Sequence, residues 1–396
     1  MEKGYRLDLG TIESLKYELP RVYDLEDRYR HTYIIGRTGS GKSTLMLNMA
    51  LYDIEHGCSV IFIDPKGDIV NSLNHLVPPE KIVNIGFNNP LTINPLKKKN
   101  YNEHDLIGEF IDILKLLITL TTPNPQSISL LMEEIISEAL INIKPADRDV
   151  DFLYKFLLSK ETRDKYFTAK PFYWEEFDRR DPITRWLVNK EKNESAQRIS
   201  SRLHLLIKDP RLQKIICGRN QLSIANLTRE GKVLLVNTSR MSHDARIYIS
   251  SLVTHAVKSF CEYEKQNEYR PLMVYADEFQ TCFSPLFSHL LATSRAYKVG
   301  FTLAHQDFGQ LSKEMLSSVF GNCNIFVAFN CGYDEARKMA GLFGVTDRDI
   351  LDLPNYNAYV RIGTQTSLVK TYPLMREVKY DVKLEYNFLR ESFFPV

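Results

Sequence analysis

The sequence predicts an α/β fold in which a largely parallel central sheet is interrupted by an all-helical insertion. Short apolar runs rich in β-branched residues alternate with helical patterns before residue 99, and the same alternation returns after residue 220. Between them, residues 100–219 carry helical patterns and no strand signal. Strands that alternate with helices are typical of a parallel sheet with right-handed crossovers. We therefore expect one sheet domain in two parts, residues 1–99 and 220–396, around an all-α domain at residues 100–219.

The first part of the sheet domain is expected to contain three strands and a long helix. Residues 33–35 and 60–63 are dense apolar runs, as in parallel strands buried on both faces, and a third strand is expected near 81–86. Residues 42–55 have a helical pattern, and Gly57 is placed to end that helix.

Helical periodicity dominates the middle of the chain. Apolar residues recur at helical spacing over 106–117, 128–140, 152–157 and 199–207, with a proline break at 123–125. Strand patterns then return at 232–237, 272–276, 300–304 and 325–329, separated by helical patterns that include 243–265 and 286–297. The last part of the chain is therefore expected to alternate strand and helix as the first part does.

The composition excludes several classes of protein. With 396 residues, 44% of them hydrophobic and 25% charged, the chain has the balance of a soluble globular protein of more than one domain. Its six cysteines never form a Cys-x-x-Cys pair, so neither a zinc site nor a disulfide framework is expected. No apolar run reaches the roughly 18 residues of a membrane span, and the N-terminus lacks the apolar core of a signal peptide. The net charge of +2 gives no sign of a nucleic-acid partner.

Residues 36–43 fit the phosphate-loop pattern G-x-x-x-x-G-K-[ST], between an expected strand and an expected helix. The glycines allow backbone N–H groups to surround phosphate oxygens, and the following helix directs its positive end at them. Lys42 is expected to face the β- and γ-phosphates, and the Ser43 hydroxyl to bind Mg²⁺. The predicted ATP-binding residues are Gly36, Arg37, Thr38, Gly39, Ser40, Gly41, Lys42, Ser43 and Thr44.

An apolar strand ends in two carboxylates, Asp277 and Glu278. Ligands of α/β proteins bind at the carboxyl ends of parallel strands, which is where this pair is expected to lie. Asp277 can hold Mg²⁺ through a bound water beside Ser43, and Glu278 can take the proton of the water that attacks the γ-phosphate. The alternative is an ordinary strand end with two solvated acids.

Three further features are candidates for a functional role. Gln306, after the strand at 299–304, could sense the γ-phosphate or orient the attacking water, and the alternative is a helix cap. Arg295 could reach a neighbouring subunit as an arginine finger, and the alternative is a surface charge that complements a helix dipole. Residues 64–68, Asp-Pro-Lys-Gly-Asp, form an expected turn whose role stays open between structure and function.

Taken in order along the chain, several segments resemble the HerA–FtsK superfamily of ring-forming DNA-pumping ATPases. Within that superfamily they are most similar to the coupling-protein ATPases of conjugation and type IV secretion. The resemblance runs from about residue 25 to about residue 365. The segments are His31, 36–44, 63–68, 94–96, 277–279, 290–295, 304–306 and 321–336.

The resemblance implies a RecA-like P-loop NTPase fold and a homo-hexameric ring with ATP and Mg²⁺ between subunits. It favours Arg295 as a finger acting in trans and Gln306 as a sensor of the γ-phosphate. It also implies that the helical insertion is the all-α domain at the cytosolic mouth of the ring. Conjugative coupling proteins usually begin with transmembrane helices, which this sequence lacks. We therefore expect a cytoplasmic protein that is either a soluble relative or attached to the membrane through a partner.

A basic segment is the first candidate for contact with DNA. Residues 185–219 contain nine basic and three acidic residues, and Arg198 and Arg202 share one helical face opposite Ile199 and Leu203. Such a stripe can follow phosphates, and the lysine run at 97–99 is a second candidate. The alternative for both is a solvated face, which charge runs usually form.

The function predicted from these features is an ATP-hydrolysing, Mg²⁺-dependent and DNA-stimulated motor that moves DNA in conjugative transfer or type IV secretion. Its expected partners are single- or double-stranded DNA, further copies of the chain, and a relaxase or a membrane-anchored secretion protein. One alternative is a genome-packaging or chromosome-processing translocase of the same superfamily. Another is a regulatory or protein-secretion ATPase that has no nucleic-acid substrate.

Overall fold

The computed structural model describes residues 7–12, 24–88, 90–97, 102–121, 129–168, 190–263, 269–281 and 285–374. Within these residues the chain divides into two compact units. The first unit spans Met1–Val83, Ile224–Ser239 and Lys258–Val396, and the second spans Asn84–Ser223 and Arg240–Val257. None of the helices described combines the length and the apolar character that crossing a lipid bilayer requires.

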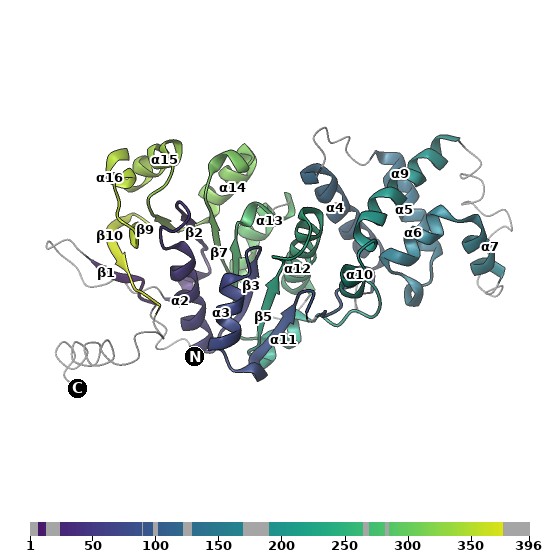
Figure 1. Ribbon diagram of the computed structural model, residues 1–396, viewed down its shortest axis with the longest axis horizontal. Coiled ribbons are helices and arrows are strands. Elements are labelled where there is room, and N and C mark those ends of the chain that lie inside the picture. The colour runs from purple at the N-terminus through teal and green to yellow at the C-terminus, as the bar shows by residue number, and fades with distance from the viewer. Residues whose placement is uncertain are drawn as a thin grey trace. The chain divides into compact units, whose positions relative to one another are not determined.

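Ten strands form one sheet in the described part of the chain, in the order β1-β10-β9-β8-β2-β7-β6-β3-β5-β4 (Figure 1). Pairing is parallel between β8, β2, β7, β6, β3 and β5. The strands are β1 (Gly10–Ile12), β2 (Thr32–Ile35), β3 (Ser59–Asp64), β4 (Ile82–Ile85), β5 (Val233–Asn237), β6 (Leu272–Asp277), β7 (Val299–His305), β8 (Ile325–Ala328), β9 (Asn357–Ile362) and β10 (Gln365–Thr371). The predicted α/β fold with a largely parallel sheet is confirmed.

An antiparallel edge completes the sheet and was not among the predicted strands. Strands β9 and β10 pair in register from Gln365 opposite Ile362, so two residues, Gly363 and Thr364, form the turn between them. Gly363 has a φ of +56°, which a residue in such a tight turn needs and which glycine adopts at little cost. Strand β9 mixes buried and half-buried positions, and β10 has exposed positions as well, so both lack the continuous apolar runs of the parallel strands.

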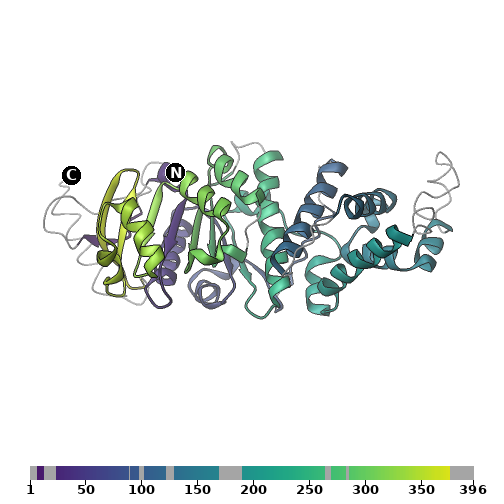
Figure 2. The same cartoon turned by 90° about the horizontal axis from the view of Figure 1, so that it is seen from above.

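Helices cover both faces of the sheet in the first unit. Helices α2 (Lys42–Glu55) and α3 (Asp68–Leu76) lie on one face, and α13 (Pro285–Thr293) and α14 (Lys313–Asn322) lie on the other (Figures 1 and 2). The other α-helices described in this unit are α1 (Leu25–Arg28), α11 (Ile224–Glu230), α15 (Tyr333–Phe343) and α16 (Asp347–Leu351). Helix α12 (His243–Tyr263) begins in the second unit and ends in the first.

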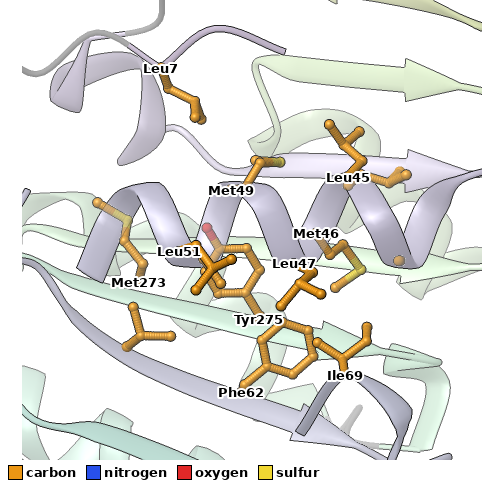
Figure 3. Close-up of a cluster of buried hydrophobic side chains, with 14 of the residues drawn as sticks. Leu7, Leu45, Met46, Leu47, Met49, Leu51, Phe62, Ile69, Met273 and Tyr275 are labelled. Carbon is orange, nitrogen blue, oxygen red and sulfur yellow. The ribbon is translucent and has the colours of Figure 1, made fainter. Parts of the chain in front are cut away.

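The core beneath α2 fixes the start of that helix relative to the strands. Met46 and Met49 of α2 pack with Phe62 of β3 and Tyr275 of β6, and all four are almost fully buried (Figure 3). The rings of Phe62 and Tyr275 stack with centroids 5.3 Å apart. Nearly complete burial of a large apolar side chain stabilises the fold by about 1.5–3 kcal/mol. The phosphate-loop helix is therefore seated on the strands that carry the acidic residues.

A buried ion pair ties α1 to the same core. The Arg28 guanidinium donates hydrogen bonds to Asp53 Oδ2 at 3.0 Å and to the Tyr275 hydroxyl at 2.9 Å. The side chains of Arg28 and Asp53 are 1% and 0% exposed. Charges so deeply buried are tolerated because each has a partner.

The described part of the second unit is built mainly from helices. They are α4 (Glu103–Thr121), α5 (Leu130–Asn142), α6 (Val150–Leu158), α7 (Lys160–Thr168), α9 (Lys190–Ile207) and α10 (Pro210–Ile216). Ser129, Asp149 and Asp209 accept hydrogen bonds from the first turns of α5, α6 and α10, as helix caps do. Phe110, Leu140, Phe156 and Leu203 are fully buried. The extent of an insertion at residues 100–219 stays a prediction.

Candidate nucleotide-binding site

The phosphate loop connects β2 to α2 at the carboxyl edge of the parallel strands. Gly39 and Gly41 have φ angles of +79° and +117°, in the left-handed region that favours glycine. A Cβ atom on Gly36 would lie 2.7 Å from Cβ of Phe329 and 2.7 Å from Oγ of Ser40. The three glycines are therefore required by the path of the loop, as the motif predicts.

The Lys42 side chain is turned into this loop. Its ammonium donates hydrogen bonds to the carbonyl oxygens of Gly36 and of Arg37, the latter at 2.9 Å. Burial lowers the pKa of Lys42 to about 8, although the negative charge of Asp277 opposes the shift. The loop thus holds one desolvated cation. Of the other predicted ATP-binding residues, Ser40 is buried, Thr44 is half-buried, and Arg37, Thr38 and Ser43 are exposed.

Asp277 and Glu278 lie at the same edge as the phosphate loop. Asp277 is opposite Ala304 of β7, and the next residue of β7, His305, is opposite Ile35 of β2. The carboxyl ends of β6, β7 and β2 are therefore side by side, and Lys42 and Asp277 are close enough to shift each other's pKa. Burial raises the pKa of Asp277 to about 6, which shows how strongly the protein interior disfavours its charge.

Glu278 is held by two groups that come from other elements. Its Oε1 atom accepts a hydrogen bond from Lys66 Nζ at 2.7 Å and another from the side-chain amide of Gln306. A third hydrogen bond reaches its Oε2 atom from the Gln280 side-chain amide at 3.0 Å. Burial raises the pKa of Glu278, but the hydrogen bonds from Lys66 and from Gln280 outweigh it, so the pKa lies below its usual value. Glu278 also has a φ of +50°, a strained angle for a residue other than glycine.

The hydrogen-bonded series continues into the phosphate loop. Thr38 Oγ1 donates to Gln306 Oε1 at 2.7 Å, and Gln306 in turn donates to Glu278. Gln306 is half-buried and follows β7 directly. The structure therefore brings Gln306 together with both the loop and the acidic pair.

The turn at residues 64–68 explains the position of Lys66. Asp64 Oδ1 accepts a hydrogen bond from the Lys66 amide at 2.9 Å, and its Oδ2 accepts from the amides of Ile69 and Val70 at the start of α3. Gly67 has a φ of +88°. The turn is thus fixed by its own aspartate, and it projects Lys66 toward β6, where the ammonium also lies 3.9 Å from Asp277 Oδ2. Sequence reasoning placed this turn at the edge of the sheet but assigned Lys66 no contact.

Arg295 is not part of this site within one chain. It lies in the 3-10 turn Ser294–Tyr297, which directly precedes β7, so it is at the amino edge of the strands and not at the carboxyl edge. Its side chain is 50% exposed and lies 3.8 Å from Glu26 Oε2. A role toward a neighbouring subunit stays a prediction.

The predicted DNA-contact residues lie on α9 of the second unit. Arg198 is exposed and Arg202 is half-buried, whereas Ile199 and Leu203 of the same helix are buried. Of the second candidate, Lys97 lies 4.0 Å from Asp149. Lys98, Lys99 and Arg185 lie outside the described residues. The exposed position of Arg198 is compatible with a ligand, and nothing in the structure identifies that ligand.

A glycine loop, a strand that ends in acids and a strand followed by glutamine, all at one edge of a parallel sheet, define a P-loop nucleotide-binding domain. The chain belongs to the family described as helicase HerA, central domain, which matches residues 16–257. A second family, described as the TraM recognition site of TraD and TraG, matches residues 271–356. The resemblance to HerA–FtsK proteins is therefore confirmed. No curated protein sequence matches the chain significantly.

The fold is similar to that of several solved structures. VirB4 of Thermoanaerobacter pseudethanolicus is 14% identical, with 95% of this chain and 99% of that one covered and a TM-score of 0.65. The unbound form of the bacterial conjugative coupling protein TrwBΔN70 is 15% identical over 92% of this chain and 89% of its own, with a TM-score of 0.62. TrwB in complex with ADP and Mg²⁺ is 15% identical over 94% and 91%, with a TM-score of 0.64. The predicted RecA-like P-loop fold is confirmed.

Proposed function

We propose that this chain is an ATPase that moves DNA, of the coupling-protein kind that serves conjugation or type IV secretion. The observation that carries the proposal is the convergence of Lys42, Asp277 and Glu278 at one edge of the sheet, in a chain of the HerA family. Phosphoryl transfer to water needs a cation on the phosphates, a metal-binding carboxylate and a group that orients the water. Each of these three requirements has a candidate side chain here.

Ser43 and Asp277 are the residues that would hold Mg²⁺. A hydroxyl and a carboxylate are oxygen ligands of the type that Mg²⁺ prefers, and both belong to elements that end or begin at the same edge of the sheet. Asp277 is 2% exposed and has a raised pKa, so a cation beside it would relieve the cost of its buried charge. When bound, Mg²⁺ neutralises charge on the β- and γ-phosphates. A solved structure of TrwB, similar in fold, is a complex with ADP and Mg²⁺.

Glu278 is the proposed base. Its lowered pKa keeps it ionised, so that it is able to accept the proton of the attacking water. Lys66 and Gln306 act as positioning residues, because they hold the Glu278 carboxylate from two directions. Gln306 is also the proposed sensor of the γ-phosphate, since it is bonded to Thr38 at the tip of the phosphate loop.

The working form that we propose is a homo-hexameric ring. Arg295 lies at the edge of the sheet opposite its own phosphate loop and is half exposed, so any contact with a triphosphate has to be made with a neighbouring copy. DNA contact is proposed through Arg198 and Arg202, with a relaxase or a membrane-anchored secretion protein as partner. A cytoplasmic location, with attachment to the membrane through such a partner, is part of the proposal.

Replacement of Glu278 by glutamine tests the catalytic part of this proposal. We expect Glu278→Gln to bind ATP as the wild type does and to hydrolyse it at least about 100-fold more slowly, because the amide cannot take up a proton. Glu80→Gln, at an exposed glutamate of the Pro79–Lys81 turn, is the matched control and should hydrolyse ATP at the wild-type rate. Turnover by Glu278→Gln at the rate of the control would remove Glu278 from its role.

The ATPase rate with and without DNA tests the motor. We expect duplex or single-stranded DNA to stimulate hydrolysis, and the stimulation to fade as salt is raised, because binding to phosphates releases counterions. Arg198→Ala should weaken the stimulation and leave the basal rate unchanged. A rate that DNA does not alter at any salt concentration would favour a regulatory or protein-secretion ATPase instead.

A further inference from the structure

Tyr356 lies beside the phosphate loop and is not used by the chemistry described above. It is 45% exposed, although a tyrosine usually buries much of its ring. It directly precedes β9, and β9 pairs with β8, which in turn pairs with β2. The residue therefore approaches the loop from the side of the sheet opposite to β7 and β6.

The position of Tyr356 is fixed by contacts with the loop itself. Its backbone N–H donates to the Ser40 carbonyl at 2.8 Å, and its own carbonyl accepts from the Thr371 amide at 2.7 Å and from the Thr371 hydroxyl at 2.9 Å. A Cβ atom on Gly41 would lie 3.0 Å from Cδ1 of the Tyr356 ring, so the ring packs directly on the first residue before α2.

The backbone of Tyr356 is strained. Its φ is +66°, in the left-handed region, where a residue with a bulky side chain costs about 1–3 kcal/mol. Such strain persists only where the surrounding structure enforces it, here through the bonds to Ser40 and Thr371. The result is an exposed tyrosine whose backbone is held in one place beside the phosphate loop.

The sheet order determines which end of a nucleotide this ring can meet. Asp277 ends β6, Glu278 follows it and Gln306 follows β7, so the γ-phosphate end of a triphosphate belongs on that side of the loop. The α-phosphate and the nucleoside then extend to the other side of β2, toward β8 and β9. Tyr356 is on that side. Aromatic rings stack on the faces of nucleobases, and such stacking contributes about 1–3 kcal/mol for each base.

We propose that the Tyr356 ring is the stacking platform for the base of the bound nucleoside triphosphate. The proposal rests on the proposed nucleotide site and adds the part of that site that binds the base. Since stacking uses the face of a base and not its edges, Tyr356 contributes affinity for any purine nucleotide. It contributes nothing to a ligand that has phosphates but no base.

Binding of two ligands by the purified full-length chain separates the base from the phosphates. The dissociation constants of Mg-ATP and of Mg-tripolyphosphate are measured by calorimetry for the wild type, Tyr356→Asn, Tyr356→Phe and Tyr263→Asn. Asparagine tolerates a positive φ, so Tyr356→Asn removes the ring without new backbone strain. Tyr263, 44% exposed at the end of α12, is the matched control.

We expect Tyr356→Asn to weaken ATP binding about tenfold or more, and to change tripolyphosphate binding less than twofold. Tyr356→Phe and Tyr263→Asn should bind both ligands as the wild type does. Equal weakening of both ligands would mean that the ring only supports the loop, and it would overturn the proposal, as would unchanged ATP binding. A wild-type chain that binds neither ligand would instead overturn the proposed function.

A measurement on the wild-type chain needs no variant. The emission of 2-aminopurine riboside triphosphate should fall on binding, because stacking against an aromatic ring quenches this base. Unchanged emission on saturation of the wild-type chain would overturn the proposal.

Discussion

Lowering the pH from 7.5 to 5.0 is expected to destabilise the fold by about 2 kcal/mol through His31 alone. The His31 ring is buried between two elements, and both of its nitrogens are used: Nε2 donates to the Leu291 carbonyl at 2.8 Å, and Nδ1 accepts from the Phe301 amide at 3.1 Å. This arrangement requires the neutral ring. A second proton on Nδ1 would remove the acceptor of the Phe301 amide and place a charge in the core.

The magnitude follows from the pKa. Burial lowers the pKa of His31 from its usual 6.5 to about 4, with the positive charge of Arg28 acting in the same direction. Between these values the unfolded chain binds a proton that the folded chain does not, so stability rises with pH in this range. The contribution is complete above pH 6.5 and is lost as the pH falls toward 4. Integrated over the whole interval it is about 3 kcal/mol, of which about 2 kcal/mol is lost by pH 5.0.

The assay is denaturant unfolding at a series of pH values, for the wild type and for His31→Asn. Asparagine accepts the φ of +65° at this position and does not titrate, so the variant keeps the backbone and loses the pH-dependent contribution. His305, whose pKa burial also lowers to about 4, is present in both chains and cancels in the difference. We expect the difference in the free energy of unfolding to shrink by about 2 kcal/mol from pH 7.5 to 5.0. Parallel curves for the two chains would refute the reasoning.

Two further predictions concern charged contacts. Lys66→Met removes the ammonium that holds Glu278, so we expect kcat to fall about tenfold with the KM for ATP within twofold, and Lys66→Arg to recover most of the rate; steady-state kinetics that give Lys66→Met a wild-type kcat would contradict this role. Arg28→Met leaves the Asp53 carboxylate buried without its guanidinium, and we expect a loss of about 3–5 kcal/mol in denaturant unfolding. The double variant Arg28→Met/Asp53→Leu should recover part of that loss, and an equal or larger loss would show that the charge pair is not the cause.

The parts of the fold that sequence predicted are those whose cause is local. A parallel strand buried on both faces needs a continuous apolar run, and β3, buried at all six positions, shows that run in the sequence. The phosphate loop is one continuous segment, so the spacing of its glycines and lysine is enough to predict phosphate binding. The antiparallel strands β9 and β10 were missed because their mixed burial leaves no run and no clean alternation.

The contacts that sequence could not predict depend on strand order. Lys66 and Glu278 are 212 positions apart, and they meet only because β3 and β6 are neighbours in the sheet. The available signal for this contact was that β3 and β6 each end in an acid. In addition, the acid that ends β3 is followed after one proline by Lys66 and Gly67. Tyr356 was missed for a related reason, since its approach to Gly41 depends on the antiparallel edge that follows it.

The phosphate loop, which follows β2, has different contacts on the β7 side and on the β8 side. On the β7 side, Thr38 of the loop is bonded to Gln306, Gln306 to Glu278, and Glu278 to Lys66, so four side chains from four segments form one connected series. A triphosphate bound in the loop as we propose would meet this series at Thr38. It would also meet Lys42, whose ammonium donates hydrogen bonds to loop carbonyls in this structure. In the site that we propose, a shift of the Thr38 hydroxyl toward a phosphate would remove a hydrogen bond to Gln306, and it would thereby alter the support of the Glu278 carboxylate. On the β8 side, by contrast, Tyr356 is held by backbone bonds that do not involve this series. We therefore expect binding of the nucleoside through Tyr356 and hydrolysis through Glu278 to depend on separate sets of contacts, so a variant that loses one should leave the other measurable.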